Sequence, residues 1–158
     1  MKTPNILILG IGNPLMGDDG IGVHAARELA PRCEALPGVR CLDGGTLGYL
    51  LAGYLEGIDG LIVVDAAQMQ ADPGTVQVFE DQAMDHFLVT HPNCSVHEVG
   101  LADLIGMAAL EGHLPARRAL VAVQPQETTW NIEMSGAVAA SLPLACAQVM
   151  NLMEVWRS

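Results

Sequence analysis

The chain has 158 residues, of which 51% are hydrophobic and 16% are charged, and its formal net charge is −11. This composition excludes a disordered chain, and we expect one domain over residues 1–158 that is long enough to bury its own core. Eighteen acidic residues against seven basic ones make nucleic acid and anionic membranes poor candidate partners and favour a cation or a basic protein surface.

Short apolar runs that stop at Gly, Asp or Pro predict buried strands at residues 5–10, 39–44, 60–66 and 119–125. Residues 74–80 instead alternate apolar and polar side chains after an Asp-Pro-Gly turn. Such alternation is typical of a half-buried strand, so we expect an antiparallel edge strand there.

Helical periodicity predicts helices at residues 20–33, 46–55, 101–110 and 136–156. Pro143 lies inside the last of these and predicts a kink or a break, because proline removes a helical hydrogen bond. Residues 81–95 show no clear period and are predicted to form a long loop. The predicted fold class is α/β, a three-layer fold with a largely parallel twisted sheet of about five strands, one antiparallel edge strand, and helices on both faces.

The four cysteines form no Cys-x-x-Cys pair and lie among apolar residues, at positions Cys33, Cys41, Cys94 and Cys146. Reduced, structural thiols are the simplest interpretation, and they indicate a cytoplasmic protein. The apolar run at the N-terminus is too short for a signal peptide, and no later stretch reaches the roughly 18 apolar residues of a membrane span. We therefore expect no membrane insertion, and a chain that is monomeric on its own.

The stretch ILILGIGNPLMGDDGIGV leads from the first predicted strand into the first predicted helix. Gly10 and Gly12 fit the start of a dinucleotide-binding G-x-G-x-x-G pattern, but Leu15 stands where the third glycine belongs. The loop has no lysine for a P-loop, and Asp18 and Asp19 would repel a phosphate at the helix start. The loop is therefore predicted to attract a cation.

Acidic residues follow two of the predicted strands at the edge where ligands collect in open α/β sheets. Asp19 follows the first strand and Asp65 follows the third. Taken alone, Asp19 is equally well explained as a helix cap, and Asp65 as a residue that ends its strand through a turn hydrogen bond. Asp18 can supply the cap instead, which leaves Asp19 available for chemistry.

A histidine completes a candidate metal site. Ser95 and Glu98 match the capping-box pattern, which predicts a helix that begins near Val96 with His97 in its first turn. The positive end of the helix would keep His97 neutral near pH 7, with a ring nitrogen available to a metal, although a lone histidine there is more often a surface residue. Two carboxylates and one imidazole suit nickel or zinc.

These segments, in this order, resemble the maturation endopeptidases of nickel-iron hydrogenases. The motifs that carry the resemblance are GIGNPLMGDDGIGV, LDGGT, LIVVDA and SVHEVGLADLI. The resemblance covers nearly the whole chain, and it is weaker over residues 124–136, where Gln126 replaces a common glutamate. Family members carry nickel-sensing ligands at positions that correspond to Asp19, Asp65 and His97.

The resemblance implies an endopeptidase that removes a C-terminal extension from the nickel-loaded precursor of a hydrogenase large subunit. Asp19, Asp65 and His97 would be both its catalytic and its metal-binding residues, and the nickel would be supplied by the substrate protein. No serine or cysteine has an evident base partner, and Cys94 is interpreted as a loop or core thiol. The alternative is a nickel-binding chaperone for hydrogenase assembly that docks without cutting.

Two further segments have both a functional and a structural explanation. Asn13 and the turn Asp43-Gly44-Gly45-Thr46 are candidate contacts to the substrate chain. We favour the simpler interpretation, a turn asparagine and a glycine turn that ends in a threonine cap. The remaining histidines are interpreted as surface or packing residues, with His91 the best placed to touch a partner: His24, His86, His91 and His113.

Overall fold

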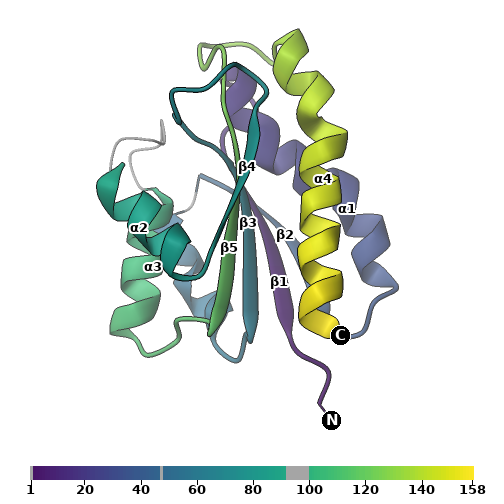
Figure 1. The fold of residues 1–158 in the computed structure, drawn as a ribbon, viewed down its shortest axis with the longest axis vertical. Coiled ribbons are helices and arrows are strands. Elements are labelled where there is room, and N and C mark those ends of the chain that lie inside the picture. Colours follow the sequence, from purple (N-terminus) through teal and green to yellow (C-terminus); the bar gives the residue numbers. More distant parts are fainter. Residues whose placement is uncertain (1, 47, 92–99) are drawn as a thin grey trace.

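Five strands form one twisted sheet in the order β2-β1-β3-β5-β4 (Figure 1). The computed structural model of the chain describes every residue except 1, 47 and 92–99. The strands are β1 (Ile6–Ile11), β2 (Val39–Gly45), β3 (Gly60–Ala66), β4 (Val76–Glu80) and β5 (Arg117–Val123). All neighbouring strands pair in parallel except β4, which runs antiparallel to β5 at one edge. The predicted sheet and its antiparallel edge strand are confirmed.

Helices cover both faces of the sheet and complete the predicted three layers (Figure 1). Helices α1 (Ile21–Glu34) and α4 (Gly136–Arg157) pack on one face, over an aliphatic core that includes Ile8, Ile62 and Val121. The other face carries α2 (Gln82–Thr90), α3 (Leu101–Leu110) and a 3₁₀ helix, η2 (Gly48–Leu55). The helix predicted at residues 46–55 is thus present in the tighter 3₁₀ form.

Helix α2 lies within the segment that the sequence predicts as a loop, residues 81–95. Met84, Phe87 and Leu88 are its buried residues and pack into the core. Their spacing of three and four positions is a helical stripe, but it spans little more than one turn and is therefore a weak signal. The prediction of a long loop was wrong over Gln82–Thr90.

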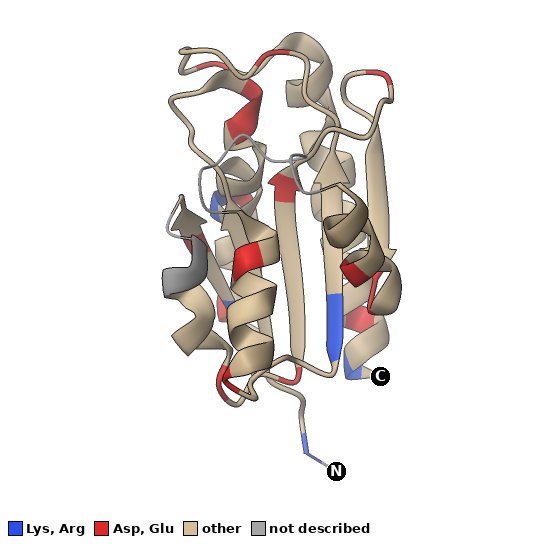
Figure 2. Cartoon of the chain, turned by 90° about the vertical axis from the view of Figure 1, so that its left-hand side faces the viewer, with Lys and Arg blue, Asp and Glu red and all other residues tan. Residues whose placement is uncertain are grey.

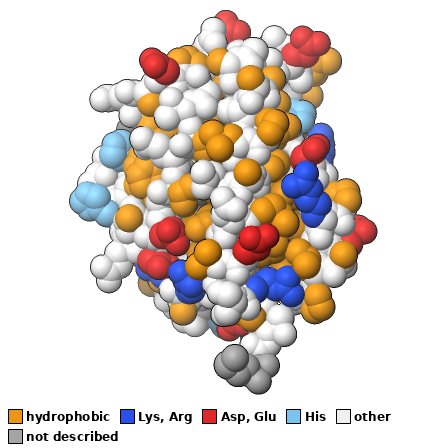
Figure 3. All heavy atoms as spheres, turned by 45° about the vertical axis from the view of Figure 1, so that its right-hand side comes forward, with side chains coloured by type: hydrophobic (Ala, Val, Ile, Leu, Met, Phe, Trp, Pro, Cys, Tyr) orange, Lys and Arg blue, Asp and Glu red, His pale blue; other side chains and the backbone are white. Residues whose placement is uncertain are grey.

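Helix α4 is continuous through Pro143, so the predicted break does not occur. Pro143 and Ala139, whose carbonyl loses its helical partner, are both exposed, so water can satisfy that carbonyl. The helix is long and apolar enough to cross a membrane, with a mean hydropathy of 1.4, which contradicts the expectation that no stretch reaches that length. Its inner side packs over the sheet through Val138 and Val149, as in the core helix of a globular domain, while apolar side chains also spread over its outer face (Figure 3).

Candidate functional site

Glycines bring the start of helix α1 against the ends of two strands. A Cβ atom at Gly22 would overlap the carbonyl oxygens of Ile11 and Val64. Ile11 is the last residue of β1, and Val64 lies near the end of β3. Gly12 has a φ of 143°, and a Cβ there would overlap the carbonyl oxygen of Asp19. The glycines of the first loop therefore serve a close approach of backbones, which places the 3₁₀ helix η1 (Gly17–Gly20) beside β3.

The topology of the sheet makes this place a crevice for ligands. After β1 the chain turns to α1 on one face, whereas after β3 it passes through β4 to α2 and α3 on the other face. Adjacent parallel strands whose connections diverge in this way leave a crevice outside their carboxyl ends. Asp19 follows the first of these strands, and Asp65 lies near the end of the second.

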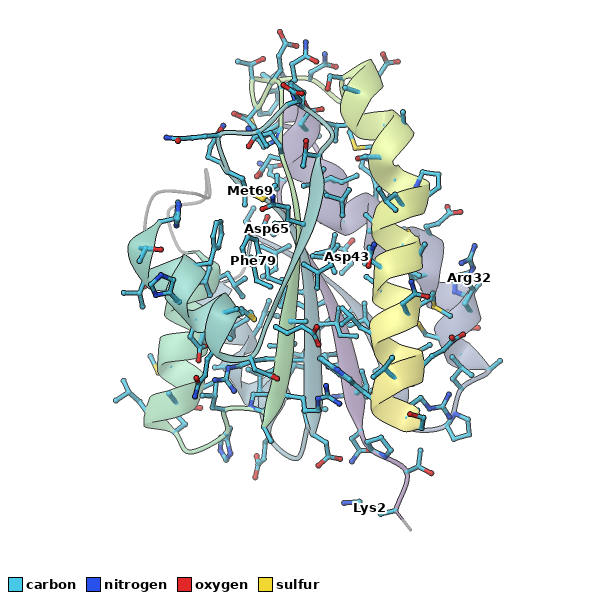
Figure 4. All side chains as sticks on the ribbon, viewed as in Figure 1. Lys2, Arg32, Asp43, Asp65, Met69 and Phe79 are labelled. Atoms are coloured by element: carbon cyan, nitrogen blue, oxygen red, sulfur yellow. The ribbon has the colours of Figure 1, made fainter. Side chains whose placement is uncertain are left out.

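Asp19 and Asp65 are both buried at this crevice. Asp19 is 1% exposed, and its Oδ2 accepts a hydrogen bond from the Asn13 backbone N–H at 2.9 Å. Asp65 is 3% exposed and pairs in register with Ala122 of β5. Figure 4 shows Asp65 toward the carboxyl end of the sheet, below Met69. The structure therefore places two of the three predicted site residues on neighbouring segments at one edge.

Asp18 has a structural role that the sequence did not reveal. Its carboxylate is fully buried and accepts hydrogen bonds from the backbone N–H groups of Gln126, Glu127 and Ser135 and from the Ser135 hydroxyl, at 2.7–2.9 Å. Neither η1 nor α1 has a side-chain cap, so the prediction that Asp18 caps the first helix was wrong. Four donors satisfy this buried carboxylate, and Asp18 is an anchor for a distant segment.

That segment, residues 126–135, is called the strap from here on. Besides the bonds to the Asp18 carboxylate, Gly17 N–H donates to the carbonyl oxygen of Asn131 at 2.7 Å, and Asn131 N–H donates to that of Leu15 at 2.9 Å. The Asp18 N–H donates to the carbonyl oxygen of Glu127 at 2.8 Å. The strap is thus fastened along the loop that carries Asp19.

Gln124 fastens the segment that follows Asp65. Its side chain is 5% exposed, and its Oε1 accepts the backbone N–H of Met69 at 2.7 Å and that of Ala71 at 3.4 Å. Its Nε2 donates to Gln68 Oε1 at 2.8 Å. The exit from β3 is therefore held by a buried amide at the end of β5, which local sequence patterns do not reveal.

The third predicted site residue, His97, lies outside the described residues, as do Ser95, Glu98 and Cys94. The predicted helix start near Val96 also lies outside the described residues. Helix α3 spans Leu101–Leu110, and the N–H of Gly100 donates to Asp103 Oδ2 at 3.0 Å. Across the described residues, no group of three His, Cys, Asp or Glu side chains is arranged to hold a metal ion.

The turn interpretation of Asn13 is confirmed, whereas Asp43 and Gly45 belong to strand β2. Asn13 Oδ1 accepts the Leu15 N–H at 3.0 Å, and Asp43 Oδ1 accepts the Gly45 N–H at 3.1 Å. Asn13 also orients Asp19 through its own N–H. Sequence reasoning anticipated the turn but not this contact.

The loops at the carboxyl edge are acidic. The described segments 12–20, 67–75 and 124–135 contain aspartates and glutamates and no lysine or arginine. Figure 2 shows acidic and no basic residues on the loops at this end of the molecule. The edge therefore favours the approach of cationic groups.

Comparison with known proteins identifies the family. A sequence profile described as hydrogenase maturation protease matches residues 23–152. The chain belongs to this family. The hydrogenase 2 maturation protease of Escherichia coli (strain K12) is 34% identical to it over 146 residues, which cover 92% of this chain and 88% of that protease.

Further comparisons agree with the hydrogenase maturation protease family. The structure of the hydrogenase maturating endopeptidase HybD from E. coli superimposes with a TM-score of 0.82 at 31% identity, covering 95% of this chain and 92% of HybD. The hydrogenase expression/formation protein HoxM of Azotobacter vinelandii is 40% identical over 127 residues, but this chain spans only 61% of its length. The family and enzyme class predicted from the motifs are confirmed.

Proposed function

We propose that this chain is an endopeptidase that removes a C-terminal extension from the precursor of a nickel-iron hydrogenase large subunit once nickel is in place. Asp19, Asp65 and His97 would recognise the nickel carried by that precursor. The observation that carries the proposal is the pair of buried aspartates, Asp19 and Asp65, at the crevice of a hydrogenase maturation protease fold.

The chemistry of these residues supports recognition of a metal. Asp19, which accepts the N–H of Asn13, follows β1, and β1 pairs with β3, the strand that carries Asp65. Carboxylates and an imidazole suit a divalent transition metal.

In this proposal the chain reads the state of its substrate. The Asn13 N–H holds the carboxylate of Asp19 in place, and Gln124 holds the segment after Asp65. A nickel-free precursor would lack the metal that these residues bind, and it would not be cleaved. Cleavage would therefore occur only after nickel insertion is complete. A polarised carbonyl or an activated water beside the metal is the chemistry that such a site supplies.

The test compares two forms of one substrate. The protein is incubated with the nickel-loaded and with the nickel-free precursor, and the large subunit is then weighed by mass spectrometry. We expect loss of a C-terminal peptide from the loaded form alone. Loss from neither form would contradict the proteolytic function and favour a nickel-binding chaperone, whereas loss from both would contradict recognition of nickel.

We also propose that the protein acts as a monomer in the cytoplasm, without membrane insertion. Helix α4, the one described helix long and apolar enough to span a membrane, packs one side into the core. Sedimentation of the purified protein checks the oligomeric state, and cell fractionation checks the location. A dimer, or protein in the membrane fraction, would contradict the corresponding part.

A further inference from the structure

Three large apolar side chains stand exposed beside the candidate site. Trp130 and Ile132 of the strap are 76% and 74% exposed, and Leu15 of the first loop is 45% exposed. An isolated exposed apolar residue is common, but several on one small surface usually mark an interaction site.

The backbone brings together the segments that carry these three side chains. Met16 and Asn131 pair in an isolated parallel bridge. Leu15 precedes Met16, and Trp130 and Ile132 flank Asn131, so the three exposed side chains come from two paired segments. We call Leu15, Trp130 and Ile132 the apolar platform.

The platform rests on a fixed backbone. The two paired segments are joined by the Gly17–Asn131 and Asn131–Leu15 hydrogen bonds. Both ends of the strap are bound to the buried Asp18 carboxylate through the N–H groups of Glu127 and Ser135. A surface whose backbone is already ordered loses less entropy when it binds a partner.

We propose that the apolar platform is a docking surface for the hydrogenase large-subunit precursor, which would meet it with an apolar segment flanked by lysine or arginine. Charge complementarity points to this chemistry. Glu127 and Glu133 are exposed on the strap, and residues 12–20 and 126–135 contain no basic residue. An apolar centre with an acidic rim is complementary to a partner surface that has an apolar centre and a basic rim.

Continuity with the crevice identifies this partner as the substrate. The strap is bound to Asp18, and the next residue, Asp19, is the candidate site residue that follows β1. A chain that presents its cleavage site to Asp19 and Asp65 also reaches the adjoining platform. This inference rests on the proposed function, because the occupant is the substrate of that function.

The experiment measures cleavage of the nickel-loaded precursor over a range of its concentrations. We expect the double variant Trp130→Ser/Ile132→Ser to raise KM by about tenfold or more, the effect of removing central apolar anchors, with kcat changed by less than about twofold. The matched control is Leu110→Ser on α3, where the leucine is 85% exposed and KM should not change. Equal KM for the wild type and the double variant would overturn the proposal, as would a loss confined to kcat.

Charge reversal provides a second arm. Glu127→Lys/Glu133→Lys should weaken docking, and the loss should shrink as salt is raised, whereas Glu154→Lys on α4 should have no effect. Direct binding of the precursor to each variant, measured by interferometry, tests the docking surface separately from the proposed proteolytic function. If the wild type does not cleave but binds more tightly than the double variant, the proposed function fails and the docking surface stands. Equal binding would overturn the docking surface.

Discussion

Asp18 and Ser135 lie 117 positions apart in the sequence, and Ser135 donates both its backbone N–H and its hydroxyl to the Asp18 carboxylate, at 2.7 and 2.8 Å. Ser135 is the residue directly before helix α4. One buried side chain thus joins the first loop to the start of the last helix. Its neighbour Asp19 accepts the N–H of Asn13 instead.

Asp18→Asn should destabilise the protein. An amide has one acceptor oxygen, so its NH₂ group would face a backbone N–H or hydroxyl group that now donates a hydrogen bond to the Asp18 carboxylate. We expect a loss of about 2–4 kcal/mol in the free energy of unfolding, measured with urea. Asp72→Asn, at an exposed aspartate of the same edge, is the control. Equal stability of the two variants would contradict the anchoring role of Asp18.

Substitutions of the site residues should act on cleavage rather than on folding. Asp19→Asn keeps an acceptor for the Asn13 N–H but removes the charge that would meet nickel. We expect Asp19→Asn, Asp65→Asn and His97→Ala each to slow cleavage of the loaded precursor by at least about 100-fold, with a native circular dichroism spectrum. Asp72→Asn should cleave normally. Wild-type activity in any one of the three would remove that residue from the site.

Gly22→Ala should be severely destabilising, because its Cβ would overlap backbone oxygens of Ile11 and Val64 that no rotamer change can move. A loss of about 3 kcal/mol or more is expected, at or beyond the upper range for overpacking. Gly106→Ala on α3 is the matched control. No atom lies near its added Cβ, so alanine should stabilise that helix by about 0.5–1 kcal/mol. Similar thermal midpoints for the two variants would contradict the close approach.

His24 on α1 should make stability fall as the solution becomes acidic. Burial, and then the positive charge of Arg27, lower the pKa of His24 below its ordinary value of 6.5, while Asp43 opposes this shift. The folded state therefore binds this proton less readily than the unfolded state. The contribution of neutral His24 to the free energy of unfolding is fully present above pH 6.5 and is lost as pH falls through the lowered pKa. His24→Gln should flatten this part of the pH profile of the urea midpoint. An unchanged profile would show that His24 does not contribute.

Features that depend on neighbours in the sequence were predictable. The apolar runs around Ile8 and Val63 indicated buried strands, and the alternation before Glu80 indicated the edge strand, because side-chain period reports burial directly. The stripe of Met84, Phe87 and Leu88 was too short to distinguish a helix from a loop, and α2 was missed.

The sequence by itself determined the α/β class and the family, and it singled out the two adjacent aspartates as candidates, because strand periodicity and the glycine-aspartate motifs are local patterns. Only the tertiary structure decided which aspartate does what. The donors to Asp18 stand more than 100 positions away, on Gln126, Glu127 and Ser135, and no local pattern records a hydrogen bond across that distance. The role of a buried carboxylate depends on the groups that the fold brings to it. The donors of the strap make Asp18 an anchor. The packing of η1 against β3 places Asp19 beside the strand that carries Asp65.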